Sequence, residues 1–276
     1  MNQSIQIGPL ALPLSLVLLA LAVIIALLVA GRMARKSGLD AEGPVYKILL
    51  VGLLVARLAF VYQFSTVYLN APWTILDIRD GGWNAPAGLI GAWLYAMTLT
   101  RRVAALRRPL LSALALASVV WGAGMLWLTV SMPDARPLPE FTAASIDDRQ
   151  VALPAFKGKP TVINLWATWC PPCRREMPAL EQAQKDHPDV NFVFLNQGES
   201  PAKVRQFLDG NRLALHNVLF DPKREVARLF NQSALPTTLF FDADGHLAGI
   251  RVGELSQATI AHRLGALAPG KAATGR

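Results

Sequence analysis

Long apolar runs separated by short polar segments make up the first half of the chain. The run from residue 10 to residue 30 carries no charged side chain, and an α-helix needs about 20 such residues to cross the hydrocarbon core of a bilayer. Three more apolar runs follow, the second of them with Arg57 inside it. The pattern predicts a membrane domain over residues 1–130 with four transmembrane helices, at about residues 10–30, 45–64, 85–100 and 109–130.

In the second half, short apolar runs alternate with amphipathic segments. Strands are predicted at residues 161–167, 190–196, 218–220, 237–242 and 247–252, and helices at residues 172–187, 201–211, 222–231 and 256–267. The Asp244-Gly245 pair between the last two strands is typical of a tight hairpin turn. Alternating strands and helices that end in a hairpin indicate an α/β domain with a mixed central sheet.

A proline-rich segment separates the two patterns. Pro133, Pro137 and Pro139 fall between them, and such a composition makes a short, stiff linker. We therefore expect the membrane domain, a linker at residues 131–139, the α/β domain at residues 140–268 and a flexible tail at residues 269–276. The predicted fold class is an α-helical membrane region of four transmembrane helices followed by an α/β domain.

The composition excludes several classes of protein. Of the 276 residues, 53% are hydrophobic and 17% are charged, and the mean hydropathy is +0.33. These values exclude a disordered chain and a purely water-soluble enzyme. The chain has two cysteines, which excludes a disulfide-rich scaffold and a four-cysteine metal site. We expect neither a metal nor an organic cofactor.

The net charge of +8 belongs mostly to the membrane half, where residues 1–139 hold 11 basic and 5 acidic side chains. Many of the basic residues lie at 31–44 and 101–108, between apolar runs. Short loops rich in lysine and arginine stay in the cytoplasm, so both ends of the chain are expected outside. No basic residue precedes the first run, which favours a retained anchor over a cleaved signal peptide. This charge pattern predicts a membrane topology and no nucleic-acid partner.

Cys170 and Cys173 are placed for redox chemistry. They follow a predicted buried strand and lie at the start of a predicted helix. We expect the positive end of the helix dipole to lower the pKa of an exposed Cys170 below its ordinary value of about 8.5. Its thiolate then attacks a partner disulfide, and Cys173 resolves the mixed disulfide. One alternative is a metal site, but two further ligands at suitable spacing are not evident. The other is a pair of inert core thiols, which would not need the prolines or the position at a helix start.

Residues from about 139 to 267 resemble the TlpA/ResA branch of the thioredoxin superfamily, which consists of membrane-tethered thiol–disulfide oxidoreductases. The five residues from Trp169 to Cys173 match its active-site motif, and Pro236 matches its cis-proline. The resemblance implies a thioredoxin-like fold in which Trp169, Leu235 and Pro236 bind an extended substrate segment. The alternative for Pro236 is an ordinary proline at the start of a strand.

The same resemblance suggests the proton-transfer group. Asn164 replaces the buried aspartate of thioredoxin, and an asparagine does not carry a proton. In the ResA group a glutamate three residues after the second cysteine tunes the site, and Glu176 occupies that position. Glu176 is therefore the candidate acid/base group, and the alternative is a solvated glutamate on the first turns of the helix. Residues 196–200 also resemble this branch and are interpreted as a structural turn.

Residues from about 45 to 100 resemble the prolipoprotein diacylglyceryl transferase family. Arg57-Leu58, the glycine pair 81–82 and the segment 88–91 match its motifs, but Pro86 stands where that family has its required histidine. Proline transfers no proton, so the resemblance implies a shortened, degenerate relative that anchors the chain and binds a lipid headgroup or a membrane partner. Arg57 inside a span is a candidate functional residue, or it reaches the interface by snorkelling.

Together these features predict a multi-pass protein of the bacterial inner membrane whose N-terminus and C-terminal domain are periplasmic. Its expected partners are the lipid bilayer, disulfide-containing periplasmic proteins such as apocytochrome c or copper-site proteins, and a DsbD-like membrane thiol donor. The donor is needed because the predicted spans contain no cysteine. Reduction of disulfides is the favoured activity. The alternatives are a dithiol oxidant and a copper-handling module for respiratory oxidase assembly.

Overall fold

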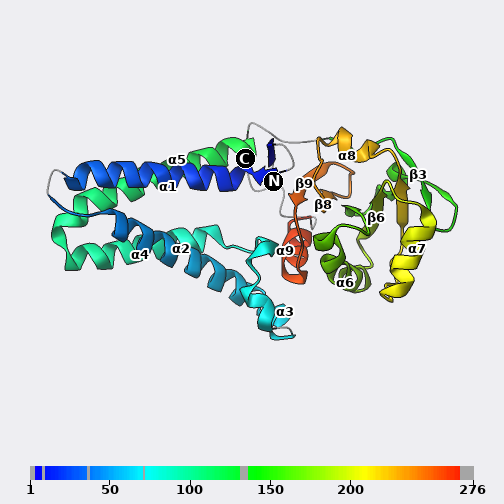
Figure 1. The fold of residues 1–276 in the computed structure, drawn as a ribbon, viewed down its shortest axis with the longest axis horizontal. Coiled ribbons are helices and arrows are strands. Elements are labelled where there is room, and N and C mark those ends of the chain that lie inside the picture. Colours follow the sequence, from blue (N-terminus) through cyan, green and yellow to red (C-terminus); the bar gives the residue numbers. More distant parts are fainter. Residues whose placement is uncertain (1–3, 8–9, 36–37, 71, 131–135, 268–276) are drawn as a thin grey trace. The chain divides into compact units, whose positions relative to one another are not determined.

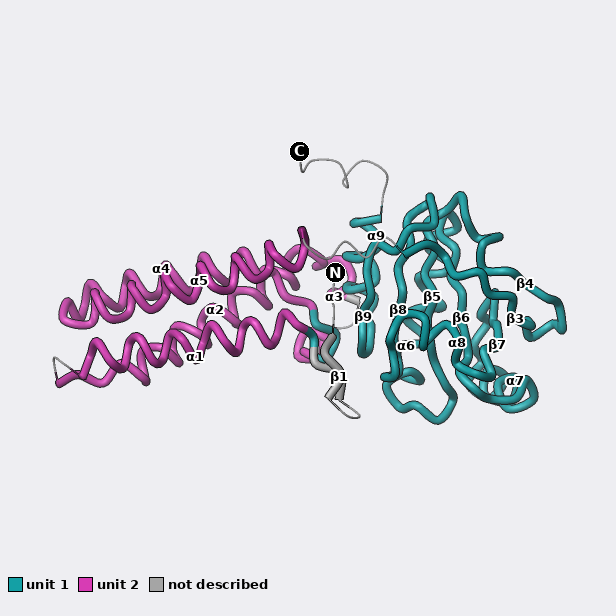
Figure 2. The backbone as a smooth tube through the Cα atoms, turned by 90° about the horizontal axis from the view of Figure 1, so that it is seen from above, with its two compact units in different colours: residues 1–13, 79–81, 133–276 teal, residues 14–78, 82–132 magenta. Residues whose placement is uncertain are grey.

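The computed structural model describes residues 4–7, 10–35, 38–70, 72–130 and 136–267. The predicted tail at 269–276 and part of the predicted linker at 131–139 lie outside these ranges. The chain forms two compact units (Figure 2). One is helical and contains residues 14–78 and 82–132, whereas the other is an α/β unit that contains residues 1–13, 79–81 and 133–276.

In the described part of the chain, four long helices build the helical unit (Figure 1). Helix α1 (Leu14–Arg35) packs mainly on α5 (Arg107–Val130), and α2 (Glu42–Gln63) packs mainly on α4 (Ala85–Arg102). Short helical segments connect them, namely α3 (Ser65–Asn70), η1 (Pro72–Leu76), η2 (Ile78–Asp80) and η3 (Ala104–Leu106).

Small residues bring the helix backbones close together. A Cβ atom placed on Gly88 of α4 would lie 2.8 Å from the Cβ of Ala56 and 2.9 Å from the backbone oxygen of Gly52, both on α2. On α1 the buried face consists of alanines at every fourth position, Ala22, Ala26, Ala30 and Ala34. Small residues at helix contacts are typical of membrane helices, where close van der Waals packing drives association.

The prediction of four transmembrane helices is wrong in number. Within the described residues, three helical stretches are long and apolar enough to cross a membrane: Leu14–Arg35, Glu42–Gln63 and Ala104–Val130. The third predicted span forms α4, but this helix has only 18 residues and ends in Arg101 and Arg102. Its glycines and threonines lower its hydropathy further. The unit is therefore a helical bundle with three candidate spans and one shorter helix.

The first predicted span also begins later than expected. Residues Leu10–Pro13 form strand β2, which pairs antiparallel with β1 (Ser4–Ile7), and α1 starts at Leu14. Proline disfavours the helical conformation of the residue before it. Pro13 therefore marks the boundary that the uninterrupted apolar run conceals.

The α/β unit contains a seven-stranded sheet in the order β4-β3-β7-β6-β5-β8-β9. The central strands β5, β6 and β7 are parallel, and the outer pairings are antiparallel, so the sheet is mixed as predicted. The strands are β3 (Thr142–Ser145), β4 (Gln150–Ala152), β5 (Thr161–Trp166), β6 (Asn191–Gln197), β7 (Val218–Asp221), β8 (Thr237–Phe241) and β9 (Leu247–Val252). The helices are η4 (Leu153–Phe156), α6 (Pro171–Asp186), α7 (Pro201–Gly210), α8 (Glu225–Leu229) and α9 (Gln257–Leu267).

Both faces of this sheet are covered. Alternate side chains of β5 point to opposite faces, so Val162 and Trp166 belong to one buried cluster and Ile163 and Leu165 to another. Residues of α6, α7 and α9 complete the first cluster, and residues of η4 and α8 complete the second. Strand β5 therefore lies inside a three-layer arrangement, and its carboxyl end leads into α6.

Two local features differ from the sequence-based expectation. Strands β3 and β4 were not predicted, because they are short and alanine-rich or polar, with little apolar alternation. Helix α8 begins at Glu225, three residues later than predicted, because Arg224 adopts a left-handed conformation (φ 55°) that interrupts the helix. Asp221 still stabilises the start of α8, since its carboxylate accepts hydrogen bonds from the backbone N–H groups of Glu225 and Val226.

Candidate active site

The two cysteines lie where β5 ends and α6 begins. Cys170 is the N-cap residue of α6, and its Sγ accepts a hydrogen bond from the backbone N–H of Cys173 at 3.3 Å. Pro171 is the first helical residue, a position where the missing N–H of proline costs nothing. Cys170 and Cys173 form a disulfide, with their Cα atoms 5.3 Å apart. The described structure is thus the oxidised form of a dithiol pair at a helix N-terminus.

Exposure differs between the cysteines and the residue before them. Trp169 is 55% exposed, whereas Cys170 is 3% exposed and Cys173 is fully buried. The expected exposed position of Cys170 is therefore not found in the disulfide form. The disulfide and the hydrogen bond from Cys173 both turn the Cys170 sulfur toward the helix, into a cluster of buried apolar side chains.

Pro236 lies beside the same end of β5. The Leu235–Pro236 peptide bond is cis, and Pro236 comes directly before β8, whose first residue, Thr237, pairs with Leu165 of β5. This register brings Leu235 and Pro236 to the carboxyl end of β5, where the cysteine loop starts. Pro236 is buried, and Leu235 is half-buried against both apolar clusters.

Glu176 is buried, which rules out the solvated position considered from the sequence. It lies one helical turn after Cys173 and is 1% exposed. Asn164 Nδ2 donates to Glu176 Oε1 at 2.8 Å, and the backbone N–H of Leu255 donates to Oε2 at 2.9 Å. Burial raises the pKa of Glu176 to about 8, although these two hydrogen bonds partly oppose the rise. A carboxyl group with this pKa holds or releases a proton near neutral pH.

The sequence interpretation missed the part that Glu199 plays at this site. Glu199 follows β6 in the segment that was interpreted only as a structural turn. Its carboxylate accepts hydrogen bonds from both the backbone N–H and the hydroxyl of Thr168, each at 2.6 Å. Thr168 lies two residues before Cys170. One signal in the sequence could have indicated this contact. Glu199 follows the strand β6, which pairs in parallel with β5. Because parallel strands end at the same edge of the sheet, the residues after β6 lie near the cysteine loop after β5.

Arg57 is surrounded by backbone carbonyl groups of its own unit. Among the described residues, its guanidinium donates to four carbonyl oxygens at distances between 2.8 and 3.2 Å, those of Thr74, Ile75, Asp77 and Gly82. It also lies 5.6 Å from the ring centre of Tyr68. Through these contacts Arg57 holds the segment between α2 and α4. Because the hydrogen bonds compensate for burial of the charge, the position of Arg57 does not require snorkelling to a lipid headgroup.

Pro86, which replaces the histidine of the acyltransferase motif, has a local structural role. It lies in the first turn of α4, and the N-cap residue Asn84 accepts a hydrogen bond from the backbone N–H of Ala87 at 3.1 Å. Proline is favoured in the first turn of a helix because its missing N–H would be unpaired there. No proton-transfer group is supplied at this position.

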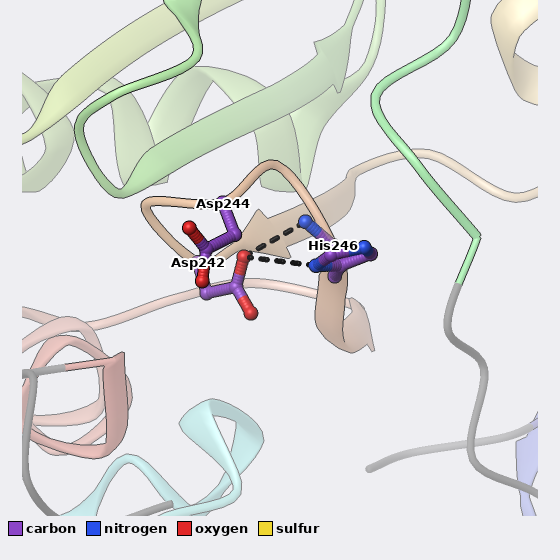
Figure 3. Close-up of side chains that lie close together, drawn as sticks. All are labelled: Asp242, Asp244 and His246. Atoms are coloured by element: carbon purple, nitrogen blue, oxygen red, sulfur yellow. Dashed lines mark hydrogen bonds and ion pairs between the residues drawn. The ribbon is translucent and has the colours of Figure 1, made fainter.

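A cluster of potential metal ligands lies elsewhere, at the turn between β8 and β9. Asp242, Asp244 and His246 each offer an atom within 4.8 Å of the others (Figure 3). Asp242 Oδ1 already accepts the backbone N–H of His246 at 2.8 Å, which closes the hairpin turn. The side chains of Asp244 and His246 are exposed. We therefore interpret the cluster as part of the turn.

Comparisons with known families agree with this division of the chain. The AhpC/TSA family model matches residues 135–250, and the prolipoprotein diacylglyceryl transferase model matches residues 2–126. The second match is longer than the stretch of about residues 45 to 100 on which the sequence resemblance rested. It extends that resemblance over most of the helical unit.

Individual relatives each match about half of the chain. The thioredoxin-like protein YneN of Bacillus subtilis is 33% identical over 141 residues, which cover 49% of this chain and 81% of YneN. The thiol–disulfide oxidoreductase ResA of the same organism is 28% identical over 143 residues, covering 51% of this chain and 79% of ResA. A thiol:disulfide interchange protein of the thioredoxin family from Chlorobium tepidum is 30% identical and covers 49% of this chain and 98% of that chain, with a TM-score of 0.43.

The cysteine pair at the start of α6, the cis-proline beside it and the similarity to YneN and ResA agree with one another. The chain belongs to the family of thioredoxin-like thiol–disulfide oxidoreductases of the ResA type, and its thioredoxin-like domain is fused to an N-terminal helical region of the prolipoprotein diacylglyceryl transferase type.

Proposed function

We propose that this protein is a membrane-anchored periplasmic reductase of disulfide bonds in exported proteins. The observation that carries the proposal is the pairing of a redox disulfide with a buried acid. Cys170 and Cys173 lie at the N-terminus of α6, and Glu176 lies one turn further along, buried, with a pKa raised by burial to about 8. This set contains a nucleophile, a resolving thiol and a proton carrier.

The reaction starts from the reduced protein. The Cys170 thiolate, stabilised by the helix N-terminus, attacks one sulfur of the substrate disulfide. An S–S bond to Cys170 forms, and the first substrate thiolate leaves and takes a proton from water. Glu176 accepts the proton of the Cys173 thiol, and the Cys173 thiolate attacks Cys170 Sγ. The second substrate thiolate leaves, so two electrons have passed to the substrate and the Cys170–Cys173 disulfide is the product.

The raised pKa of Glu176 suits this sequence of steps. In the disulfide form, a pKa of about 8 keeps Glu176 protonated at neutral pH. The carboxyl group therefore stores the proton removed from Cys173. When a donor reduces the disulfide again, Glu176 returns that proton to the leaving Cys173 sulfur.

The substrate surface proposed here consists of Trp169, Leu235 and Pro236. Trp169 offers an exposed aromatic face next to the cysteines. Leu235 and Pro236 lie at the adjoining end of β5, where an extended segment of a substrate protein can pair with the backbone of Leu235. Extended pairing of this kind recognises backbone and tolerates different side chains, which fits a reductase of several exported proteins.

The helical unit anchors the reductase in the bacterial inner membrane in this proposal. Lysines and arginines lie in the segments 31–44 and 101–108, and this charge pattern supports a topology with both chain ends in the periplasm. Since both cysteines belong to the α/β unit, electrons must come from a separate membrane thiol donor of the DsbD type. Apocytochrome c and copper-site proteins are suitable substrates, because both need reduced cysteines before they bind their cofactors.

The test is the reduction potential of the full chain in detergent micelles, equilibrated in thiol buffers and measured by trapping the free thiols. A value near that of thioredoxin, about −270 mV, would support a reductase, whereas a value near about −120 mV would identify an oxidant. The Cys173→Ala variant should accumulate a mixed disulfide with a model substrate, and Cys170→Ala should not. Absence of a reversible dithiol couple would overturn the proposal.

The same reduced protein tests the copper-handling alternative. Stoichiometric Cu(I) binding that disappears in Cys170→Ser would favour this alternative. Absence of Cu(I) binding in the reduced wild type would remove it.

A further inference from the structure

A buried carboxylate next to the cysteine loop is not used in the reaction described above. Glu199 lies between β6 and α7, and its side chain is 4% exposed. Four groups donate hydrogen bonds to its two oxygens. They are the backbone N–H of Thr168 (2.6 Å), the hydroxyl of Thr168 (2.6 Å), Asn196 Nδ2 (2.9 Å) and Lys203 Nζ (2.7 Å).

Thr168 is the point at which Glu199 acts on the active-site loop. The segment from Ala167 to Cys170 forms a tight turn, closed by a hydrogen bond from the backbone N–H of Cys170 to the carbonyl of Ala167 at 3.2 Å. Thr168 lies within this turn, and both its backbone N–H and its hydroxyl bind Glu199. Glu199 therefore holds the turn that presents Trp169 and Cys170.

The sheet places the two loops side by side. Strands β5 and β6 are parallel, and Trp166 at the end of β5 is in register with Asn196. The loops that follow these strands consequently leave the sheet at the same edge. Asn196 fixes Glu199 in turn, because its Oδ1 accepts the backbone N–H of Glu199 at 3.2 Å.

Glu199 remains ionised wherever thiol exchange takes place. Burial raises its pKa, but the hydrogen bonds from Asn196, Lys203 and Thr168 lower it more, to about 2. Hydrogen bonds to an ionised acceptor are roughly twice as strong as those between neutral groups. A carboxylate also has two acceptor oxygens, one for each of the two donors of Thr168. The side-chain amide of a glutamine has only one acceptor oxygen.

We propose that Glu199 is a positioning residue for thiol–disulfide exchange, which holds Trp169 and Cys170 in their reactive arrangement through its two hydrogen bonds with Thr168. The inference rests on the proposed function, since it concerns the same cysteine. Glu199 does not touch the sulfur atoms in this role. It acts through the loop.

The chain offers a matched control for the loss of a buried carboxylate. Asp221, at the end of β7, is also buried, and its two oxygens accept backbone N–H groups at the start of α8. Asp221→Asn therefore removes the same kind of acceptor at another helix. Lys203→Met removes the exposed ion-pair partner of Glu199 and leaves the bonds to Thr168 in place.

The experiment compares full-length variants in detergent micelles. One measurement is kcat/KM for reduction of a disulfide-containing model peptide. The other is the pH midpoint of iodoacetamide alkylation of Cys170 in a Cys173→Ala background. We expect Glu199→Gln and Thr168→Val each to lower kcat/KM by about tenfold and to raise the alkylation midpoint, because the thiolate is held less well at the helix N-terminus. Thr168→Ser, Lys203→Met and Asp221→Asn should stay within about twofold of the wild type.

Three results would overturn the inference. A lower alkylation midpoint in Glu199→Gln with no change in Thr168→Val would mean that Glu199 acts through its charge. Wild-type activity in Glu199→Gln would remove the role entirely. An equal loss in Asp221→Asn would indicate general destabilisation. If the wild type itself reduced no disulfide, the proposed function would fail, while the alkylation midpoints would still test whether Glu199 positions Cys170.

Discussion

Asn164 Nδ2 and Glu176 Oε1 are joined by a hydrogen bond of 2.8 Å between the centre of β5 and the first turns of α6. The same amide nitrogen donates to Thr238 Oγ1 on β8 at 3.0 Å. The buried site therefore contains an asparagine on the sheet and the acid on the helix, one turn from Cys173. The proposed proton carrier thus lies on α6, and its hydrogen bond with Asn164 lowers its pKa against the effect of burial.

Replacing Glu176 by glutamine should change the pH dependence of disulfide reduction. In the oxidised wild type, Glu176 loses its proton above a pH of about 8, so the leaving Cys173 sulfur no longer receives a proton from it. The ratio of wild-type to Glu176→Gln reduction rates with dithiothreitol should therefore fall as pH rises through 8. Below that pH the wild type should be about 10² faster. A ratio that is constant from pH 6 to 9.5 would contradict the role of Glu176.

Removing the amide of Asn164 should move this transition. The Asn164 N–H stabilises the ionised form of Glu176, and it is the larger of the two hydrogen bonds that lower the pKa of Glu176. The rate of Asn164→Ala is compared with that of the double variant Asn164→Ala/Glu176→Gln. The pH at which this rate ratio falls should be about one unit higher than for the wild type, which is the effect of losing one hydrogen bond to a charged group. If the pH of this fall did not change, Asn164 would not affect the pKa of Glu176.

Glu176 should also make the stability of the α/β unit depend on pH. Its pKa in the folded protein, about 8, lies above the ordinary value of 4.5, so between these values the folded state binds more protons than the unfolded state. The free energy of unfolding should fall as pH rises from about 4.5 to 8, by at most about 1.4 kcal/mol per pH unit. Thermal unfolding midpoints of the full chain in micelles at pH 5.5 and 8 test this. The Glu176→Gln variant should lack this contribution.

Arg57→Met should loosen the segment between α2 and α4. The substitution keeps most of the apolar stem of the side chain but removes the guanidinium, which leaves four carbonyl groups without this donor, at a cost of about 1–3 kcal/mol for each group that stays buried. We expect faster proteolysis within residues 72–82, with little change in the reduction potential. Proteolysis at the wild-type rate would argue against the proposed role of Arg57 in holding this segment.

Gly88→Leu should disrupt the contact between α2 and α4. Even the first side-chain atom would lie 2.8 Å from Ala56 Cβ and 2.9 Å from a backbone oxygen, so the helices must separate. Gly122→Leu is the matched control on α5, because a Cβ there meets nothing within 4 Å. The Gly88 variant should unfold at a lower temperature in micelles, by an amount equivalent to about 1–3 kcal/mol, and the Gly122 variant should not. Equal melting temperatures would contradict close packing at Gly88.

The hydrophobic pattern was sufficient to predict an apolar helical half and a second half with a mixed sheet. The site motif was recognised instead from the resemblance of Trp169 to Cys173 to the ResA branch. The failures of the hydrophobic pattern have physical causes. Helix α4 has an apolar run, but its terminal arginines and small residues reduce its hydropathy below that of a span. Strand β3 pairs with strands on both sides, and long-range pairing of this kind leaves little local signal in an alanine-rich segment.

The sequence by itself determined which chemistry the chain can carry, because two cysteines three residues apart at a helix start allow only a few reactions. Tertiary structure alone decided the surroundings of the acidic groups near the cysteines. Burial between β5, α6 and the segment at Leu255 raises the pKa of Glu176 to about 8, whereas the donors around Glu199 lower its pKa to about 2. The two glutamates are chemically identical in the sequence. Their different properties arise from partners distant in the chain, which only folding brings within hydrogen-bond distance.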